Sequence, residues 1–135
     1  MNKFLTKSME KIFNTLGSNL DEFKDKTILI TGANGLIGGF LSDFFVYLND
    51  EHDFNCKLVL TSLSSKPKRL KDLIYRNDVV YHSRDLTNDS WFFDEIDFCI
   101  YCAGYAQPNK FLSNAKKTYK LNVDAMVKTF QSVFH

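Results

Sequence analysis

Three evenly spaced glycines are the residues of this sequence whose arrangement points most directly to chemistry. Gly32, Gly35 and Gly38 follow the apolar run at residues 27–31 and open a helical pattern at residues 36–48. In that context the first glycine allows a tight turn, the second lets backbone N–H groups approach a pyrophosphate, and the third lets helix and strand pack closely. The phosphates would then lie at the positive end of the helix dipole.

This glycine turn, residues 31–38, predicts a binding site for the pyrophosphate of a dinucleotide. No Gly-Lys-Ser/Thr ending follows it, which excludes the P-loop of proteins that bind nucleoside triphosphates. The residues expected to contact this part of the cofactor are Gly32, Asn34, Gly35, Leu36, Ile37 and Gly38.

The other reactive side chains do not form a recognisable site. The histidines are scattered, with no Cys, Asp or Glu at metal-ligand spacing. Cys99 and Cys102 lie in an apolar run that predicts a strand, where side chains three residues apart point to opposite faces. We therefore expect neither a metal site nor a disulfide, and free thiols are typical of a reducing compartment.

Apolar runs and helical patterns alternate along the chain, which is typical of a parallel sheet covered by helices on both faces. The expected strands are residues 27–31, 57–61, 79–82 and 96–102. The expected helices are residues 36–48, a short segment opened by Pro67, and residues 113–134. Right-handed crossovers then predict the strand order 3-2-1-4 of a doubly wound α/β domain, a partial Rossmann-type fold.

The first 24 residues carry apolar side chains mostly three or four positions apart, which indicates an amphipathic helix or helix pair broken near Gly17. The mixed charge of the polar face favours packing against the following domain over binding to a membrane surface. We therefore divide the chain into an N-terminal helical leader at residues 1–25 and an NAD(P)-binding Rossmann domain at residues 26–135.

The fourth strand raises the question of what covers it. Its sequence, Phe98-Cys99-Ile100-Tyr101, is typical of a fully buried strand, although the order 3-2-1-4 puts it at an edge of the sheet. Strand edges are normally covered or blunted by charge. We therefore expect that the chain is the N-terminal portion of a longer protein, or that it pairs with a second copy along this edge.

The composition limits the partners of the protein. Its 135 residues, 44% of them hydrophobic, fit one globular domain. Seventeen Lys and Arg against sixteen Asp and Glu leave a net charge of +1, which creates no field to attract nucleic acid or anionic lipid. Neither a membrane-spanning run nor a signal peptide is recognisable. We expect a cytoplasmic protein that binds neither nucleic acid nor membranes.

The spacing Gly-x-x-Gly-x-x-Gly after a threonine resembles the extended branch of the short-chain dehydrogenase/reductase superfamily, the NAD-dependent epimerase/dehydratase family, which remodels nucleotide-linked sugars. Further segments resemble the family in the same order: Arg84-Asp85-Leu86, Tyr101-Cys102-Ala103-Gly104 followed by Pro108, and Leu121-Asn122-Val123. The resemblance covers residues 26–134. The N-terminal helix also resembles the leader of dehydratase and UDP-glucuronate decarboxylase-like members.

The resemblance implies a role for each of these segments. The carboxylate of Asp85, next to Leu86, would meet the adenine amino group of the cofactor. The small residues at 102–104 would lie along the cofactor, and Asn122 would help to organise the site. Many members dimerise through helices that include the one after the fourth strand, so the resemblance also implies a homodimer.

The end of the second strand departs from the family's pattern. Members that use NAD place an acidic residue there to bind the adenosine ribose hydroxyls, whereas this sequence has Thr61 and Ser62, followed by Lys66, Lys68 and Arg69. Hydroxyls and nearby cations could accept a 2′-phosphate. The cofactor is therefore expected to be NAD or NADP, with contacts from Thr61 and Ser62; a solvated loop is the alternative interpretation.

A second departure concerns catalysis. The family uses a Tyr-x-x-x-Lys pair with an upstream Ser or Thr, and none of the six tyrosines here has Lys four residues later. In the family the lysine lowers the pKa of the tyrosine, which removes a proton from a sugar hydroxyl as hydride passes to the nicotinamide. We therefore expect no catalytic residue in this chain.

These observations predict the NAD(P)-binding portion of a sugar-nucleotide epimerase, dehydratase or decarboxylase that is inactive alone. The sugar nucleotide would bind to the full-length protein, and the choice of sugar and of reaction would reside in residues outside this chain. A stand-alone binding module that senses NAD(P) without catalysis is the alternative hypothesis.

Overall fold

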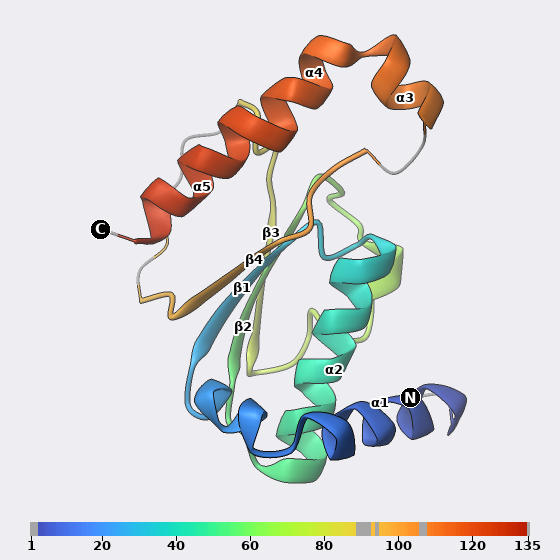
Figure 1. The fold of residues 1–135 in the computed structure, drawn as a ribbon, viewed down its shortest axis with the longest axis vertical. Helices are drawn as coiled ribbons and strands as arrows, with labels where there is room; N and C mark the ends of the chain where they lie inside the picture. Colours follow the sequence, from blue (N-terminus) through green and yellow to red (C-terminus); the bar gives the residue numbers. More distant parts are fainter. Residues whose placement is uncertain (1–2, 89–92, 94, 106–107, 135) are drawn as a thin grey trace.

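A four-stranded parallel sheet forms the centre of the molecule (Figure 1). The computed structural model describes residues 3–88, 93, 95–105 and 108–134. The strands are β1 (Thr27–Thr31), β2 (Lys57–Ser62), β3 (Val79–Ser83) and β4 (Phe98–Tyr101). Their order across the sheet, β3-β2-β1-β4, confirms the predicted 3-2-1-4 topology.

The strand register brings the four carboxyl ends to one edge of the sheet, called here the carboxyl edge. The paired positions near this edge are Ile30 with Leu60, Thr31 with Tyr101, and Thr61 with His82. The central strand β1 is covered on both faces, so Ile28, Leu29 and Ile30 are fully buried. The apolar run that predicts β1 is thus explained by burial on both faces.

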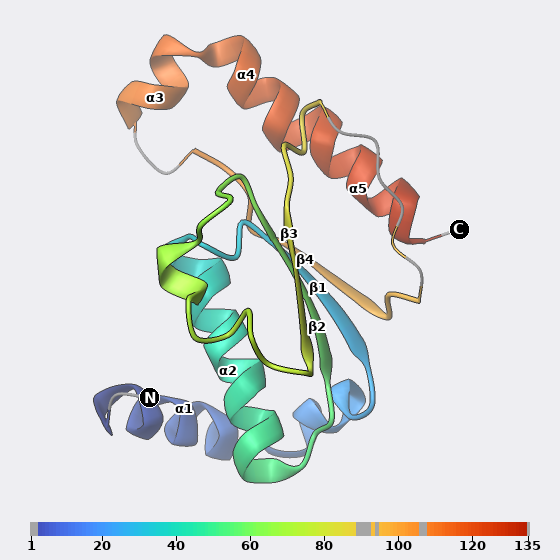
Figure 2. The same ribbon diagram turned by 180° about the vertical axis from the view of Figure 1, so that it is seen from behind.

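Helices cover both faces of the sheet, as Figures 1 and 2 show from opposite sides. Helix α2 (Leu36–His52) packs on one face, where Phe44, Phe45 and Leu48 join the main hydrophobic core. Helix α5 (Met126–Val133) lies on the other face. The single helix expected at residues 113–134 is instead a series of elements: α3 (Pro108–Ser113), α4 (Ala115–Tyr119), the π-helical turn η3 (Lys120–Ala125) and α5.

The N-terminal segment packs against the C-terminal end of α2. Helix α1 (Lys3–Leu16) is followed by the 3-10 helix η1 (Gly17–Phe23), so the break falls at Gly17 as predicted. Met9 is fully buried, and the Phe13 ring stacks on the His52 ring with 3.6 Å between centroids. The apolar face of α1 therefore lies on the rest of the molecule, as the mixed charge of its polar face predicts.

Two elements differ from the sequence-based expectation. The helix expected after Pro67 is only the 3-10 turn η2 (Lys68–Leu70), held by the fully buried side chain of Leu70. Strand β4 is half-buried, not fully buried, because only β1 pairs with it among the described residues. One face of β4 still contacts the core through Phe98 and Ile100, which explains its apolar sequence.

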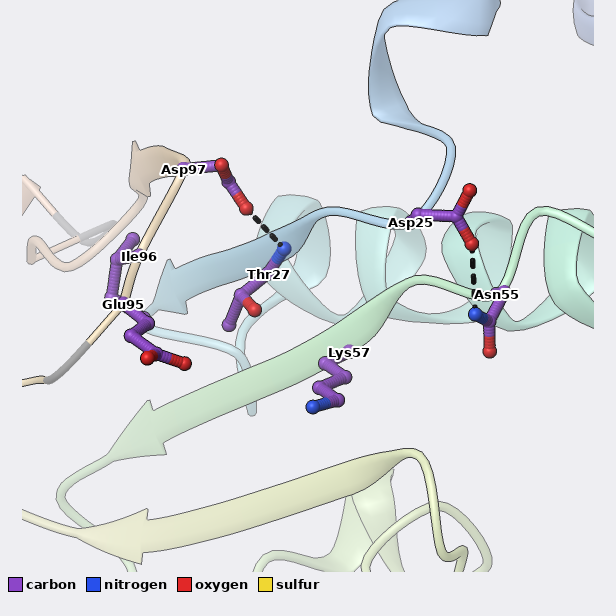
Figure 3. Close-up of a pocket in the computed structure, with 7 residues that line it drawn as sticks. All are labelled: Asp25, Thr27, Asn55, Lys57, Glu95, Ile96 and Asp97. Atoms are coloured by element: carbon purple, nitrogen blue, oxygen red, sulfur yellow. Dashed lines mark hydrogen bonds between the residues drawn. The ribbon is translucent and has the colours of Figure 1, made fainter.

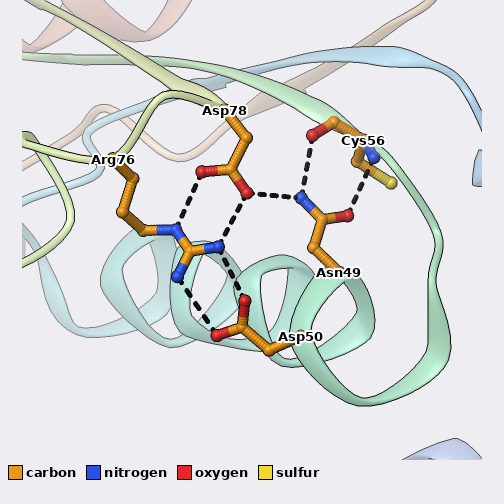
Figure 4. Close-up of polar contacts among 5 residues, drawn as sticks. All are labelled: Asn49, Asp50, Cys56, Arg76 and Asp78. Atoms are coloured by element: carbon orange, nitrogen blue, oxygen red, sulfur yellow. Dashed lines mark hydrogen bonds and ion pairs between the residues drawn. The ribbon is translucent and has the colours of Figure 1, made fainter.

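Polar side chains close the opposite, amino edge of the sheet. Figure 4 shows the Arg76 guanidinium between the carboxylates of Asp50 and Asp78, with N–O distances of 2.7 and 2.8 Å. Asn49 Nδ2 donates to Asp78 at 2.9 Å and also to the Cys56 carbonyl at 2.9 Å. Helix α2, β2 and the segment before β3 are therefore joined by one continuous hydrogen-bonded network.

A polar hollow lies beside this network, at the start of β1, β2 and β4 (Figure 3). The Thr27 backbone N–H donates to the Asp97 carboxylate at 2.8 Å, and Asn55 Nδ2 donates to Asp25 at 2.8 Å. The hydrogen bond from Thr27 lowers the pKa of Asp97. The first bond joins the start of β1 to the segment before β4, and the second joins the segments before β1 and β2, so this hollow is part of the structural framework.

Candidate dinucleotide-binding site

The backbone of the glycine turn packs too closely for side chains at two of its glycines. Gly32 has φ of +63°, and a Cβ atom there would lie 2.6 Å from the carbonyl oxygen of Cys102. A Cβ atom on Gly38 would lie 2.5 Å from the Gly32 carbonyl oxygen. Both distances are well inside van der Waals contact, so the first and third glycines have the packing roles that their spacing predicts.

The start of α2 presents backbone N–H groups at the carboxyl edge. Gly35 precedes the helix in an extended conformation and its N–H donates to the Gly32 carbonyl at 2.9 Å. The Gly39 N–H donates to the Gly35 carbonyl at 3.0 Å, so the N–H groups of residues 36–38 have no acceptor within the helix. This end of α2 is therefore suited to an anion by both its donors and its dipole.

Two large apolar side chains stand in solvent beside these N–H groups. Leu36 is 88% exposed and Ile37 is 66% exposed, although both belong to the first turn of α2. Single exposed apolar residues are ordinary on protein surfaces. Here they flank donors at the end of a buried sheet, which is an arrangement that a bound cofactor could cover.

The segment after β4 is fixed beside the glycine turn by a threonine hydroxyl. Thr31 Oγ1 accepts hydrogen bonds from the backbone N–H of Cys102 at 3.0 Å and of Ala103 at 3.2 Å. Gly104 follows, and a Cβ atom there would lie 3.5 Å from Asn122 Oδ1. The structure thus brings together the glycine turn, the small residues at 102–104 and Asn122, which sequence similarity alone assigned to one site.

Asn122 lies in the π-helical turn η3, which a tyrosine stabilises. The Tyr101 hydroxyl donates to the Leu121 carbonyl at 2.6 Å, and burial raises the pKa of Tyr101 to about 12. Local π-helical turns are frequent at functional sites because they reorient neighbouring side chains. The role of Tyr101 was not predicted, because nothing in its sequence context identifies its partner in a distant helix.

The two hydroxyl residues at the end of β2 lie in different environments. Thr61 is fully buried, its carbonyl accepts the Ala33 N–H at 2.9 Å, and its Oγ1 has no hydrogen-bond partner among the described residues. The Ser62 hydroxyl is hydrogen-bonded to the Tyr81 hydroxyl at 2.6 Å and accepts the Ser64 N–H at 3.3 Å. Thr61 therefore supports the glycine turn through its backbone, and Ser62 organises the following loop.

Asp85, the residue expected to contact the adenine, forms hydrogen bonds with the residues that follow it. Asp85 accepts hydrogen bonds from the Thr87 hydroxyl at 2.7 Å, the Thr87 N–H at 3.0 Å and Asn88 Nδ2 at 2.8 Å. The hydrogen bonds from Thr87 lower the pKa of Asp85. The lowered pKa favours the carboxylate form of Asp85 at the carboxyl edge, and the adjacent Leu86 is buried.

Metal ligands, reactive thiols and membrane-spanning helices are the other features for which the structure gives evidence. Within the described part of the chain, no three His, Cys, Asp or Glu side chains lie close enough together to hold a metal ion. Burial raises the pKa of Cys99 to about 11 and also raises that of Cys102, which makes both thiols poor nucleophiles at neutral pH. None of the described helices is long and apolar enough to cross a membrane.

Comparison with known protein families agrees with the fold and with the motifs. The model of the NAD-dependent epimerase/dehydratase family matches residues 28–134, which include the glycine turn, strands β2, β3 and β4, and all of β1 except its first residue. The chain therefore belongs to this family. Its membership supports a nicotinamide dinucleotide as the cofactor. A comparison with curated individual proteins gives no match.

Proposed function

Because the chain belongs to the NAD-dependent epimerase/dehydratase family, we propose that it binds NAD(P) as the cofactor-binding portion of a sugar-nucleotide epimerase, dehydratase or decarboxylase. One observation carries the proposal. A Cβ atom on Gly38 would lie 2.5 Å from the Gly32 carbonyl, so the turn and the start of α2 are held together by the close approach that dinucleotide-binding turns require.

The residues of the carboxyl edge have complementary parts in this proposal. The N–H groups of residues 36–38 and the helix dipole would hold the pyrophosphate. The ionised Asp85 would accept a hydrogen bond from the adenine amino group. Gly104 would leave room for the cofactor beside Asn122. When bound, the nicotinamide would supply hydride transfer to and from a sugar carbon.

The chemical step itself needs a base that this chain lacks. None of the six tyrosines is followed by Lys four residues later, so a proton on a sugar hydroxyl has no acceptor of the family's kind. We therefore propose that the 135-residue chain binds cofactor without converting a sugar nucleotide. Conversion of a nucleotide-linked sugar by the purified chain would contradict this part of the proposal.

Cofactor binding is tested by titrating the chain with NADH and following the nicotinamide fluorescence. Gly38→Ala should weaken NADH binding about tenfold or more, equivalent to ~1.4 kcal/mol, because the new methyl group displaces the start of α2. Gly17→Ala is the matched control, since a Cβ atom there has no heavy atom within 4 Å. Equal NADH affinity in the wild type and Gly38→Ala would refute binding at this turn.

We further propose that NADP is accepted as well as NAD. Residues 61–69, which begin in the last two residues of β2, contain no carboxylate to repel a 2′-phosphate, and they include Lys66 and Lys68. Parallel titrations with NADH and NADPH measure the preference directly. Affinity for NADPH equal to or above that for NADH is expected, and clearly tighter NADH binding would exclude the NADP assignment.

A homodimer is also proposed, through the outer side of the last helices. Tyr119, Val123, Val127 and Phe134 are exposed apolar side chains at helical spacing on this segment. Two copies could bury this stripe against each other. Sedimentation should detect a dimer that Val127→Lys converts to a monomer, whereas a wild-type chain that is monomeric at high concentration would rule the interface out.

A further inference from the structure

An arginine after β2 is tied to the middle of α2 by an ion pair. The Arg69 guanidinium contacts the carboxylate of Asp43, and Asp43 is only 6% exposed. A carboxylate that is so nearly enclosed by protein needs a charged partner, because an unpaired buried charge is costly. The side chain of Arg69, which belongs to the 3-10 turn η2, is therefore held against helix α2.

Gly39 makes this contact possible. A Cβ atom on Gly39 would lie 2.9 Å from Arg69 Cγ and 3.1 Å from Arg69 Nε. Gly39 is one helical turn before Asp43, so the two residues lie on the same side of α2. The aliphatic part of Arg69 thus crosses the helix directly over Gly39 to reach Asp43.

The backbone of the same arginine is bonded to the glycine turn. The Arg69 N–H donates to Asn34 Oδ1 at 3.1 Å, and Asn34 directly precedes Gly35 at the start of α2. Residue 69 therefore has two separate attachments, one through its side chain to the helix and one through its N–H to the turn. Together they join the loop after β2 to the pyrophosphate end of the site.

We infer that Arg69, with Asp43, is a positioning residue that holds the segment from the end of β2 to η2 (residues 62–69) and the Asn34 side chain in the arrangement that receives the dinucleotide. This inference rests on the proposed function. A loop that is already ordered loses less conformational entropy when the ligand binds. Arg69 therefore strengthens cofactor binding without touching the cofactor.

This role differs from the obvious one for an arginine at this position. A 2′-phosphate ligand would contribute to NADPH binding alone. A positioning residue supports the loop for either cofactor, because the ribose and the pyrophosphate are common to both. The ratio of the NADPH and NADH affinities therefore separates the two roles.

The experiment measures NADH and NADPH dissociation constants by fluorescence titration for wild type, Arg69→Ala, Asp43→Asn and the double variant. Each single change should weaken both cofactors about tenfold, the equivalent of one charge-assisted hydrogen bond, with the NADPH to NADH ratio unchanged. The double variant should be little weaker than either single variant, because both remove the same contact.

Other outcomes would contradict either the inference about Arg69 or the proposed function. Loss of NADPH binding alone would make Arg69 a phosphate ligand and overturn the inference, as would wild-type affinity in Arg69→Ala. Failure of the wild-type chain to bind either cofactor would instead refute the proposed function. Arg76→Ala serves as the control, since it removes ion pairs at the amino edge and should lower stability without changing either affinity.

A second variant keeps the test valid if Arg69→Ala folds poorly. Gly39→Ala leaves both charges in place and puts a methyl group where the Arg69 side chain crosses the helix, although that methyl group would also lie 3.2 Å from the Ala33 carbonyl oxygen of the glycine turn. It should weaken NADH and NADPH by the same factor, and the melting temperature of the free chain should fall by only a few degrees. Unchanged affinity in Gly39→Ala would also contradict the positioning role.

Discussion

The two edges of the sheet differ in whether their polar groups have hydrogen-bond partners within the protein. At the amino edge, the Arg76 guanidinium bonds to two carboxylates, and Asn49 completes the network (Figure 4). At the carboxyl edge, the buried Thr61 hydroxyl has no partner among the described residues, and the N–H groups at residues 36–38 have no helical acceptor. The network at the amino edge thus serves the framework, whereas the start of α2 leaves backbone donors open where a ligand is expected.

Two pairs of apolar side chains, one at each edge, differ in the same way. Near the amino edge, Leu20 of η1 and Phe54, two residues after the end of α2, are buried. At the carboxyl edge, Leu36 and Ile37 stand in solvent on the first turn of α2. A framework edge can bury its apolar groups permanently, whereas a binding edge has to keep some of them accessible to the ligand.

The largest effect is expected from Gly32→Ala at the carboxyl edge. The new side chain would force a positive φ on alanine and would place Cβ 2.6 Å from the Cys102 carbonyl. Backbone strain and overpacking should together lower the free energy of unfolding by roughly 3 kcal/mol, measured by urea denaturation. Gly17→Ala has a similar φ of +52° without the collision, so it should cost only about 1 kcal/mol. Equal costs in both variants would contradict the packing role of the turn.

Arg76→Ala should have the next largest effect, and on stability alone. It leaves the Asp78 and Asp50 carboxylates without their cation, which should lower the free energy of unfolding by about 2 kcal/mol. The NADH dissociation constant should stay unchanged, because the network lies at the opposite edge from the glycine turn. A parallel loss of NADH affinity would show that the two edges are coupled, and would break the comparison between them.

Thr61→Val should have a smaller effect of opposite sign. The change removes a buried hydroxyl without a hydrogen-bond partner among the described residues and nearly conserves the side-chain volume. The free energy of unfolding should therefore rise by about 1 kcal/mol. Thermal unfolding measures the stability, and an NADH titration of the same variant asks whether the hydroxyl serves the cofactor. A loss of both stability and affinity would show that a ligand or a water molecule satisfies this hydroxyl.

The smallest effect concerns the pH dependence of the amino edge. The hydrogen bond from Arg76 lowers the pKa of Asp78 in the folded chain. A carboxyl group with a lowered pKa stabilises the folded state above its unfolded pKa of about 3.9, and this contribution is lost as the pH falls through the folded value. The free energy of unfolding should therefore decrease below about pH 4. Asp78→Asn should reduce the slope of the free energy of unfolding against pH by no more than the contribution of about one bound proton. An unchanged slope would exclude Asp78 as a source of the pH dependence.

Much of the framework was predictable because its causes are local in the sequence. The apolar runs at β1 and β2 predicted strands, and the alternation of strands with helices predicted the observed strand order. The errors occurred where packing overrides local pattern. The helix expected after Pro67 is reduced to the turn η2, which the buried Leu70 fixes, and the expected last helix is interrupted by η3.

The sequence predicted the residues of the candidate site but not the hydrogen bonds and ion pairs that join them. The glycine turn, Asp85 and Asn122 were identified from motifs. Tyr101 begins one of these motifs, but nothing in the sequence indicates its hydrogen bond to Leu121 in η3. Arg69 was interpreted as a cation for a phosphate, whereas its guanidinium contacts Asp43. The local sequence around Arg69 does not indicate whether its side chain faces solvent or a helix.

The sequence by itself therefore determined the strands, their order and the glycine turn, because the period of apolar residues and the conformational range of glycine act over a few residues. Only the tertiary structure decided which polar groups meet. Asp43 and Arg69 are 26 residues apart, and Asn34 and Arg69 are 35 apart. Contacts between residues so far apart in the sequence depend on how α2 and the segment after β2 pack together. The location of the candidate site at the carboxyl edge can thus be predicted from the sequence, whereas the contacts that support it depend on the fold.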